Sequence, residues 1–188
     1  MPRPARHFVP GVPCHVIQRG HNRHVCFFTR HDYAVYLRKL EEYSRRLGVA
    51  VHSYVLMTNH VHLLLTPSDE SCISKLMQVL GRSYVRHVNE SYRRTGTLWE
   101  GRFKSSMVDS ERYFLTVSRY IELNPVRARM VGHPVEYPWS SFRTNATGLS
   151  SSLLSQHKIY MVLGRCSESR QSAYRALNDS DTVESCYR

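Results

Sequence analysis

The segment from Tyr54 to Thr66 restricts the fold more than any other part of the chain. It reads Tyr-Val-Leu-Met-Thr-Asn-His-Val-His-Leu-Leu-Leu-Thr, so that two apolar runs flank the short polar turn Thr58-Asn59. This pattern predicts a tight hairpin of two strands, at 49–57 and 60–66, and therefore an antiparallel sheet. His60 and His62 open the second strand two positions apart, which places both side chains on one face.

These two histidines are candidate metal ligands. Neutral imidazole offers one sp2 nitrogen per ring to a divalent cation, and histidine is available in that form near neutral pH. The alternative is that both rings are satisfied by hydrogen bonds on a half-buried strand, because His-x-His is a short and common pattern.

The rest of the chain predicts an alternation of strands and helices. Further strands are expected at Cys14–Arg19, Val25–Thr29 and Leu98–Val108. Helices are expected at Asp32–Arg46, with Asp32 as the cap and an end near Gly48, at 71–93, and from Asp109 or Ser110 to near Asn124, where Pro125 follows. Two helices on one face of an antiparallel sheet would form an α+β sandwich, leaving the other sheet face free for a ligand.

The length of 188 residues suits one domain of ordinary size. Residues 144–155 are rich in Ser, Thr, Asn and Gly, which favours a linker. We therefore expect a main domain over 1–148 and a tail over 149–188 that is partly ordered or helical.

The composition of the chain indicates the cell compartment in which the protein is expected. No apolar run approaches the roughly 20 residues of a membrane span, and the N-terminus lacks the apolar stretch of a secretory signal. The five cysteines include no Cys-x-x-Cys pair, so reduced thiols are expected rather than a disulfide framework or a zinc knuckle. These features favour a cytoplasmic protein that is not bound to a membrane.

The net charge of +11 favours a polyanionic partner, and 22 of the 26 basic residues are arginine. Guanidinium pairs with phosphate as a two-pronged donor, which points toward nucleic acid. The basic excess lies in residues 1–148, which carry 21 basic and 11 acidic side chains. The alternative is a basic protein with no polyanionic ligand.

The helix expected at 71–93 has one cationic side and one apolar side. Its basic residues fall within about 20° of one line along the helix; they are Lys75, Arg82, Arg86 and Arg93. A helix face that carries only positive charges suits contact with phosphates. The alternative is an ordinary solvated helix face, although such faces usually mix positive and negative charges. Arg102 and Lys104 form a second basic line beside Trp99 and Phe103, aromatic residues that suit either stacking on unpaired bases or the core.

The helix that ends near Asn124 carries a candidate nucleophile. Phe114, Val117 and Ile121 form its expected buried stripe, and Tyr120 and Asn124 share a neighbouring face one turn apart. If that face meets the histidines, Asn124 could give a metal an oxygen ligand while Tyr120 attacks a phosphate. A phenol needs a nearby cation to be an effective nucleophile. Alternatively, Tyr120 is a boundary residue and Asn124 caps the next helix.

Three motifs together resemble one family. Asn59–Leu65 (Asn-His-Val-His-Leu-Leu-Leu), Leu98–Lys104 (Leu-Trp-Glu-Gly-Arg-Phe-Lys) and Arg119–Arg129 (Arg-Tyr-Ile-Glu-Leu-Asn-Pro-Val-Arg-Ala-Arg) are similar to the single-tyrosine HUH transposases, in particular to the REP-associated tyrosine transposases of the IS200-like group. The resemblance extends from about Pro10 to Phe142.

The resemblance implies a ferredoxin-like, RRM-like α+β fold with a central antiparallel sheet. It implies that His60, His62 and Asn124 bind Mg²⁺ or Mn²⁺, and that Tyr120 attacks single-stranded DNA to form a 5′-phosphotyrosine link with release of a 3′-hydroxyl. It further implies that the protein is associated with the nucleoid and acts as a monomer or homodimer. Its substrates would be single-stranded DNA hairpins, namely REP-like palindromes with a short flanking tetranucleotide. Weaker candidates for reading that DNA are Arg19, Asn22 and Arg23.

The chain departs from the family at Thr58, where relatives often carry proline, and in its last residues. Two other functions remain open: a catalytically silent module that binds hairpins, and a metal-dependent nuclease that uses water. The intact His60-Val-His62 and Tyr120 favour catalysis over the silent module. The absence of Asp and Glu between Val49 and Thr66 weakens the water-using nuclease.

Overall fold

The computed structural model describes residues 6–179, which fold around one four-stranded antiparallel sheet. The strands are β1 (Cys14–Arg19), β2 (Val49–Leu56), β3 (His60–Pro67) and β4 (Lys104–Met107), in the spatial order β2-β3-β1-β4. The helices are α1 (Arg30–Arg46), α2 (Cys72–Ser91), α3 (Glu111–Glu122), α4 (Asn124–Arg127), α5 (Phe142–Thr147), α6 (Lys158–Met161) and α7 (Ser167–Asp179), with short 3-10 turns at His21–Arg23 and Pro134–Glu136. The predicted α+β sandwich is confirmed.

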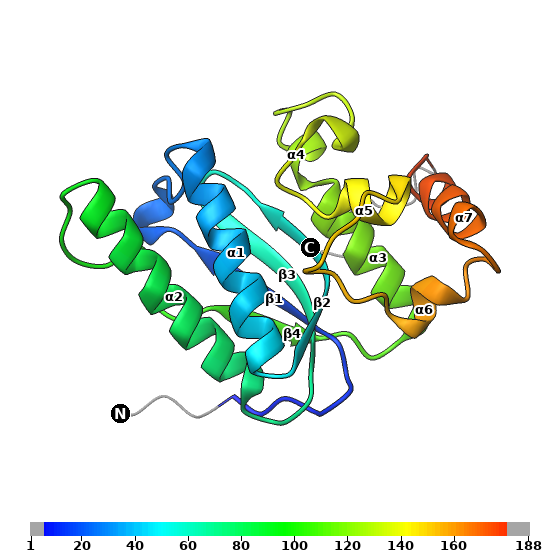
Figure 1. Ribbon diagram of the computed structural model, residues 1–188, viewed down its shortest axis with the longest axis horizontal. Helices are drawn as coiled ribbons and strands as arrows, with labels where there is room; N and C mark the ends of the chain where they lie inside the picture. Colours follow the sequence, from blue (N-terminus) through cyan, green and yellow to red (C-terminus); the bar gives the residue numbers. More distant parts are fainter. Residues whose placement is uncertain (1–5, 180–188) are drawn as a thin grey trace.

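Helices cover both faces of the sheet. Helices α1 and α2 lie side by side on one face, and α3 lies on the other with α5, α6 and α7 beyond it (Figure 1). The expectation that the second face is left free for a ligand is therefore wrong. Leu64 and Val55 are apolar side chains on that face, and they are buried by α3. The residues of α3 that pack on them are those of its apolar stripe, Phe114, Val117 and Ile121.

The hairpin predicted at Thr58-Asn59 is present. The amide of Met57 donates to the carbonyl of His60 at 2.8 Å, which closes a two-residue turn between β2 and β3. Helix α1 also ends as predicted, because Gly48 adopts a φ of +66°, which a glycine accepts without strain.

Two predicted strands are wrong in whole or in part. Residues 25–29 form no strand, because Cys26 and Phe27 both donate to the single carbonyl of Thr58 and the chain then turns into α1. Thr29 caps that helix, while Asp32 lies three residues inside it as the partner of a capping box. The strand expected over 98–108 is limited to β4, because the backbone turns at Gly101, where φ is +67°.

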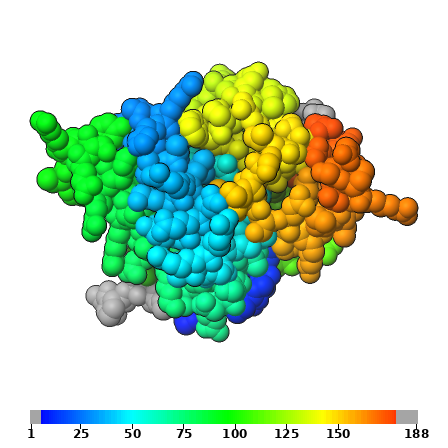
Figure 2. Space-filling view, in the orientation of Figure 1, coloured from blue at the N-terminus to red at the C-terminus, as the bar shows by residue number. Residues whose placement is uncertain are grey.

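The segment from 144 to 155, expected to be a linker, is packed against the sheet. It contains the end of α5, and Leu154 forms a bridge with Val51 of β2. Figure 2 shows these yellow and orange residues lying along the cyan ones without a gap between them. Further along, Tyr174 of α7 is buried, so this part of the tail belongs to the packed structure.

Among residues 6–179 no helix is long and apolar enough to cross a membrane. The four cysteines in this range are free thiols, three of them buried and Cys166 exposed; Cys186 lies outside the described residues.

Candidate functional site

Strand β3 sends its side chains alternately to the two faces of the sheet. Val61, Leu63 and Leu65 are fully buried in the core that contains α1 and α2. His60 and His62 alternate with them, and Leu64 of the same set packs with α3. The two histidines therefore lie on the face that carries α3, on backbone held by β1 and β2 at its two sides.

A third histidine, His15 of β1, lies beside them. Its Nε2 atom is 2.8 Å from Nδ1 of His62, and the two rings stack with centroids 5.1 Å apart. His15 pairs with Leu64 in the sheet register, which puts its side chain on the histidine face. His15 was not predicted from the sequence, because only the strand register brings it beside His62, 47 positions along the chain.

Hydrogen bonds orient the rings of both candidate ligands. Nδ1 of His60 is 2.7 Å from Oδ1 of Asn59, and an amide oxygen only accepts, so this Nδ1 carries the proton. Nε2 of His60 then holds the lone pair. When Nδ1 of His62 donates to His15, Nε2 of His62 is likewise left with its lone pair.

The histidines are neutral at pH 7. Burial lowers the pKa of His60 to about 4, with a contribution from the positive charge of Arg19. Burial, followed by the neighbouring His15, His60 and Arg19, lowers the pKa of His62 to about 2. Neutral imidazole is the form that coordinates cations, so the environment favours ligation over protonation.

Helix α3 places Tyr120 against the histidines. Ser110 caps the helix by accepting from the amide of Tyr113, and the apolar stripe fixes its rotation on the sheet. Tyr120 lies next to the stripe, half-buried, with its ring edge-on to His62 at 5.8 Å and to His15 at 6.1 Å between centroids. The ring of Tyr120 therefore lies beside His62 and His15, on the histidine face of the sheet.

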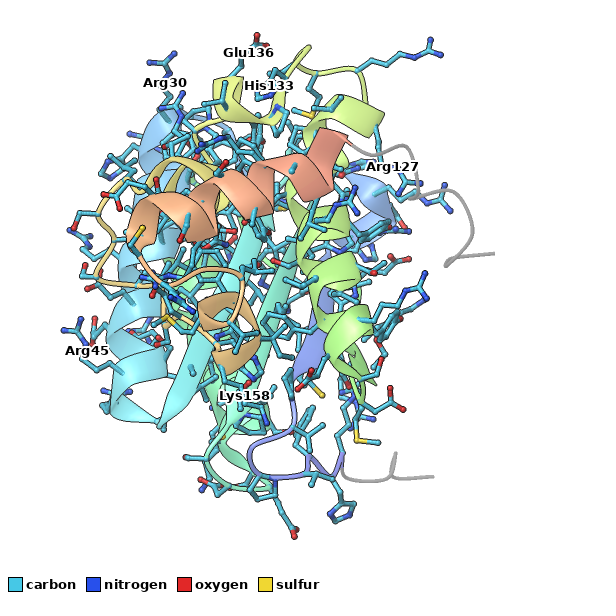
Figure 3. The ribbon with its side chains drawn as sticks, turned by 90° about the vertical axis from the view of Figure 1, so that its right-hand side faces the viewer. Arg30, Arg45, Arg127, His133, Glu136 and Lys158 are labelled. Carbon is cyan, nitrogen blue, oxygen red and sulfur yellow. The ribbon has the colours of Figure 1, made fainter. Side chains whose placement is uncertain are left out.

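Asn124 and Arg127 follow Tyr120 in the next turns. The amide nitrogen of Asn124 donates to the carbonyls of Tyr120 at 2.7 Å and Ile121 at 3.3 Å, so its oxygen is the atom suited to a cation. The guanidinium carbon of Arg127, which Figure 3 labels near the end of α3, is 5.0 Å from the centre of the Tyr120 ring. Arg127 was missed, because its position depends on the turn at Leu123.

No group of three His, Cys, Asp or Glu side chains within the described residues is arranged to hold a metal. Two histidine nitrogens and one amide oxygen form a donor set of a different kind: the amide oxygen suits Mg²⁺ or Mn²⁺, whereas imidazole nitrogen is a borderline donor that Mn²⁺ accepts more readily than Mg²⁺. The donor chemistry is consistent with the expected ion.

The basic residues are distributed over two sides of the sheet. Those of α2 and the segment after it are exposed on the side opposite α3; they are Lys75, Arg82, Arg86 and Arg93. Arg102 and Lys104 are exposed at the β4 edge. The structure therefore does not bring the α2 stripe to Tyr120.

Arg19 is the candidate DNA-binding residue that lies at the histidines, because it pairs with His60 in the register. Asn22 and Arg23 are exposed in the following turn, with φ of 51° and 59°.

A buried polar network holds the far side of α3. Glu122 is fully buried and accepts hydrogen bonds from Asn145 at 2.8 Å, from Tyr174 at 2.9 Å and from Ser141. Burial raises the pKa of its carboxyl to about 7. These bonds join α3 to α5 and α7, which constrains the helix that carries Tyr120.

One solved structure shares this fold. The structure of a REP-associated tyrosine transposase bound to a REP hairpin matches with a TM-score of 0.68 at 17% identity, over 84% of this chain and 93% of that one. A candidate transposase from Deinococcus radiodurans R1 matches with a TM-score of 0.45 at 21% identity, over 64% of this chain and 95% of that one. No curated protein matches the chain.

The family comparison covers the hairpin, the histidines and the tyrosine helix together. The model of the family described as "Transposase IS200 like" matches residues 9–124, which is more than half of the chain. On this match, the protein belongs to the IS200-like transposase family.

Proposed function

We propose that this protein is a metal-dependent transesterase that cleaves and rejoins single-stranded DNA at REP-like hairpins through a 5′-phosphotyrosine intermediate. The observation that carries the proposal is the meeting of Tyr120 with His62, at 5.8 Å between ring centres, in a chain of a transposase family. Both groups stand on regular elements, which favours a fixed geometry for catalysis.

Mg²⁺ or Mn²⁺ would be held by Nε2 of His60, Nε2 of His62 and the amide oxygen of Asn124. When bound, the ion would polarise the scissile phosphate and neutralise part of its charge. Asn59 and His15 would keep the two imidazoles in the required orientation, since each bonds to the Nδ1 atom that faces away from the ligating nitrogen.

The phenol oxygen of Tyr120 would attack the phosphorus atom, and the bond from phosphorus to the 3′ oxygen would break. The proton lost by the tyrosine ends on the released 3′-hydroxyl, so atoms and charge balance without an oxidant or a nucleotide cofactor. The covalent link conserves the energy of the phosphodiester, which permits rejoining. Arg127, beside the Tyr120 ring, would favour the negative charge that develops on the phenol oxygen.

The DNA partner is proposed from charge and from the family. The matched structure is described as bound to a REP hairpin, and the present chain carries a net charge of +11. Arg19 would contact the strand at the histidines, with Asn22 and Arg23 next to it. Arg102 and Lys104 at the sheet edge would continue the contact toward the arginines of α2.

The test uses hairpin DNA with single-stranded flanks, labelled at either end and incubated with Mn²⁺ or Mg²⁺ before a denaturing gel. A 5′-phosphotyrosine link predicts that label at the 3′ end migrates with the protein, whereas label at the 5′ end appears as a free shorter strand. Tyr120→Phe should abolish both products and retain binding, because it removes one hydroxyl and no charge.

Tyr113→Phe, in the same helix two turns earlier, is the matched control and should cleave normally. Cleavage by Tyr120→Phe protein would refute the covalent mechanism and indicate water as the nucleophile. Binding by the wild-type protein without cleavage of any flanked hairpin would favour the silent module instead.

A further inference from the structure

A cavity of about 840 Å³ lies on the sheet face opposite Tyr120, between α2 and the loop from Thr97 to Phe103. Its volume falls within the range of roughly 300–1,000 Å³ that is usual for ligand pockets. Met77, Val85 and Phe103 contribute apolar walls. None of the contacts that build the histidine site uses this cavity.

The basic residues around the cavity favour an anionic ligand. Arg6, Lys75, Arg82 and Arg102 line it, together with one carboxylate, Glu70, which lies 3.8 Å from His7. Four cationic side chains around apolar walls match a ligand that has a flat apolar part and a phosphate.

Two buried polar atoms within the cavity lining lack hydrogen-bond partners in the described part of the chain. They are Oε1 of Gln18 and Nε1 of Trp99, from side chains that are only 7% and 5% exposed. A buried acceptor and a buried donor without partners are unfavourable for folding alone. A ligand that presents a donor and an acceptor on one edge would satisfy both.

Gly81 supports the same conclusion. It lies inside α2, where glycine is less favourable than alanine. A Cβ atom at this position would be 3.7 Å from both Nε2 of Gln18 and Nε1 of Trp99, which is ordinary van der Waals distance. Packing therefore does not require glycine here, and an added methyl group would lie in contact with these two groups.

We propose that this cavity binds one unpaired nucleobase of the DNA, with the base edge bonded to Gln18 and Trp99 and the adjoining phosphates contacted by Lys75, Arg82 and Arg102. A nucleobase is flat, carries donors and acceptors on its edge and is attached to phosphate, which matches the three features of the cavity. The inference rests on the proposed DNA function. It places a second DNA contact on the sheet face that carries α2, opposite Tyr120. Gln18 and Arg19 are adjacent, so the strand would be held on both sides of the sheet.

The test is a titration of ¹⁵N-labelled Tyr120→Phe protein, full length, followed through the indole N–H signals of its two tryptophans. The probes are single-stranded pentanucleotides of thymidine, deoxycytidine, deoxyadenosine and a mixed sequence containing deoxyguanosine. The Trp99 signal should shift saturably with at least one of them. Trp139, whose ring stacks on Tyr33, should not shift. An abasic pentamer of equal charge should leave Trp99 unchanged.

Gly81→Ala and Gln18→Leu should each weaken this binding at least tenfold. Neither should lower the melting temperature, because one improves the helix and the other removes an unpartnered amide. An unmoved Trp99 signal with every probe, or an equal shift with the abasic pentamer, would overturn the pocket. Wild-type cleavage separates the two proposals: adduct formation without a Trp99 shift refutes the pocket alone, and a base-dependent shift without any adduct refutes the transesterase alone.

Discussion

The two faces of the sheet are built from the same strands and differ in what the strands present. On the face toward α1 and α2, β3 contributes Val61, Leu63 and Leu65, all fully buried. On the face toward α3, the same strand contributes His60 and His62. Because successive side chains of β3 point to opposite faces, one set packs in the core and the other set lines the proposed active site. Substitutions at neighbouring positions should therefore affect mainly the stability or mainly the cleavage activity.

The largest effect is expected at the histidine face. His62→Ala should reduce formation of the covalent adduct by about 10³-fold or more, because loss of metal assistance removes several kcal/mol of transition-state stabilisation. Because His62 is buried and bonded to His15, the substitution also lowers the melting temperature, so cleavage is compared at a temperature where both proteins are folded. Gel assays with Mn²⁺ measure adduct formation, and a thermal scan measures the melting temperature. Wild-type cleavage by the variant would show that His62 is not a metal ligand.

The neighbouring core position should show the reverse. Leu63→Ala leaves a cavity in the packed face, so the free energy of unfolding should fall by about 2–5 kcal/mol. Protein that remains folded should still form the adduct. Denaturant titration measures the stability of the variant, and a cleavage assay at low temperature measures its activity. Folded Leu63→Ala protein that does not cleave would contradict the proposed division between the two faces.

An intermediate effect is expected at His15. His15→Phe keeps a ring beside His62 and removes the hydrogen bond to its Nδ1 atom. The Mn²⁺ concentration for half-maximal cleavage should rise about 10- to 100-fold, which is the usual effect of losing a residue that orients a ligand. His15→Gln, which can still accept from His62, should restore part of the loss; an unchanged Mn²⁺ requirement would argue against a positioning role.

Acidification should destabilise the metal-free protein. Burial lowers the pKa of His15 and His52 to about 4 and that of His62 to about 2, so these groups take up protons in the unfolded chain near pH 6.5 before they do so in the folded one. Stability is then fully present above about pH 6.5 and is lost as the pH falls toward 4. Each such histidine contributes up to about 1.4 kcal/mol per pH unit.

Glu122 acts in the opposite direction, because burial raises its pKa to about 7 and the folded form retains the proton longer as the pH rises. One carboxyl against four histidines leaves the net sign unchanged, because burial lowers the pKa of His60 to about 4 as well. Urea unfolding at pH 7 and pH 5 measures the difference, and greater stability at pH 5 would show that the histidines do not remain neutral on folding.

The smallest effect is expected on α2, away from the catalytic face. Replacing Arg82 and Arg86 together by alanine should weaken hairpin binding and reduce the slope of log affinity against log salt by roughly 1.4–1.8 if both contact phosphates. Binding at several salt concentrations checks this, and an unchanged slope would exclude these arginines from the DNA interface. Adduct formation at saturating DNA should be preserved.

Local patterns predicted the elements that depend on neighbours in the chain. The β2–β3 hairpin follows from its apolar runs and two-residue turn, and α3 from the spacing of Phe114, Val117 and Ile121. The strand predicted at residues 25–29 is wrong, although these residues are typical of strands. They form a loop in which the amides of Cys26 and Phe27 donate to the carbonyl of Thr58. The predicted length of β4 is also wrong, because a positive φ at Gly101 is a property of the folded backbone.

The sequence by itself determined the antiparallel hairpin, the shared face of His60 and His62, and a helix carrying Tyr120, because periods of 2 and 3.6 residues fix which side chains point together. Only the tertiary structure decided that His15 joins them, that Arg127 lies over Tyr120, and that the α2 arginines lie on the opposite side of the sheet. These relations depend on strand register and on which face each helix covers, and such long-range pairings leave no periodic trace in the sequence.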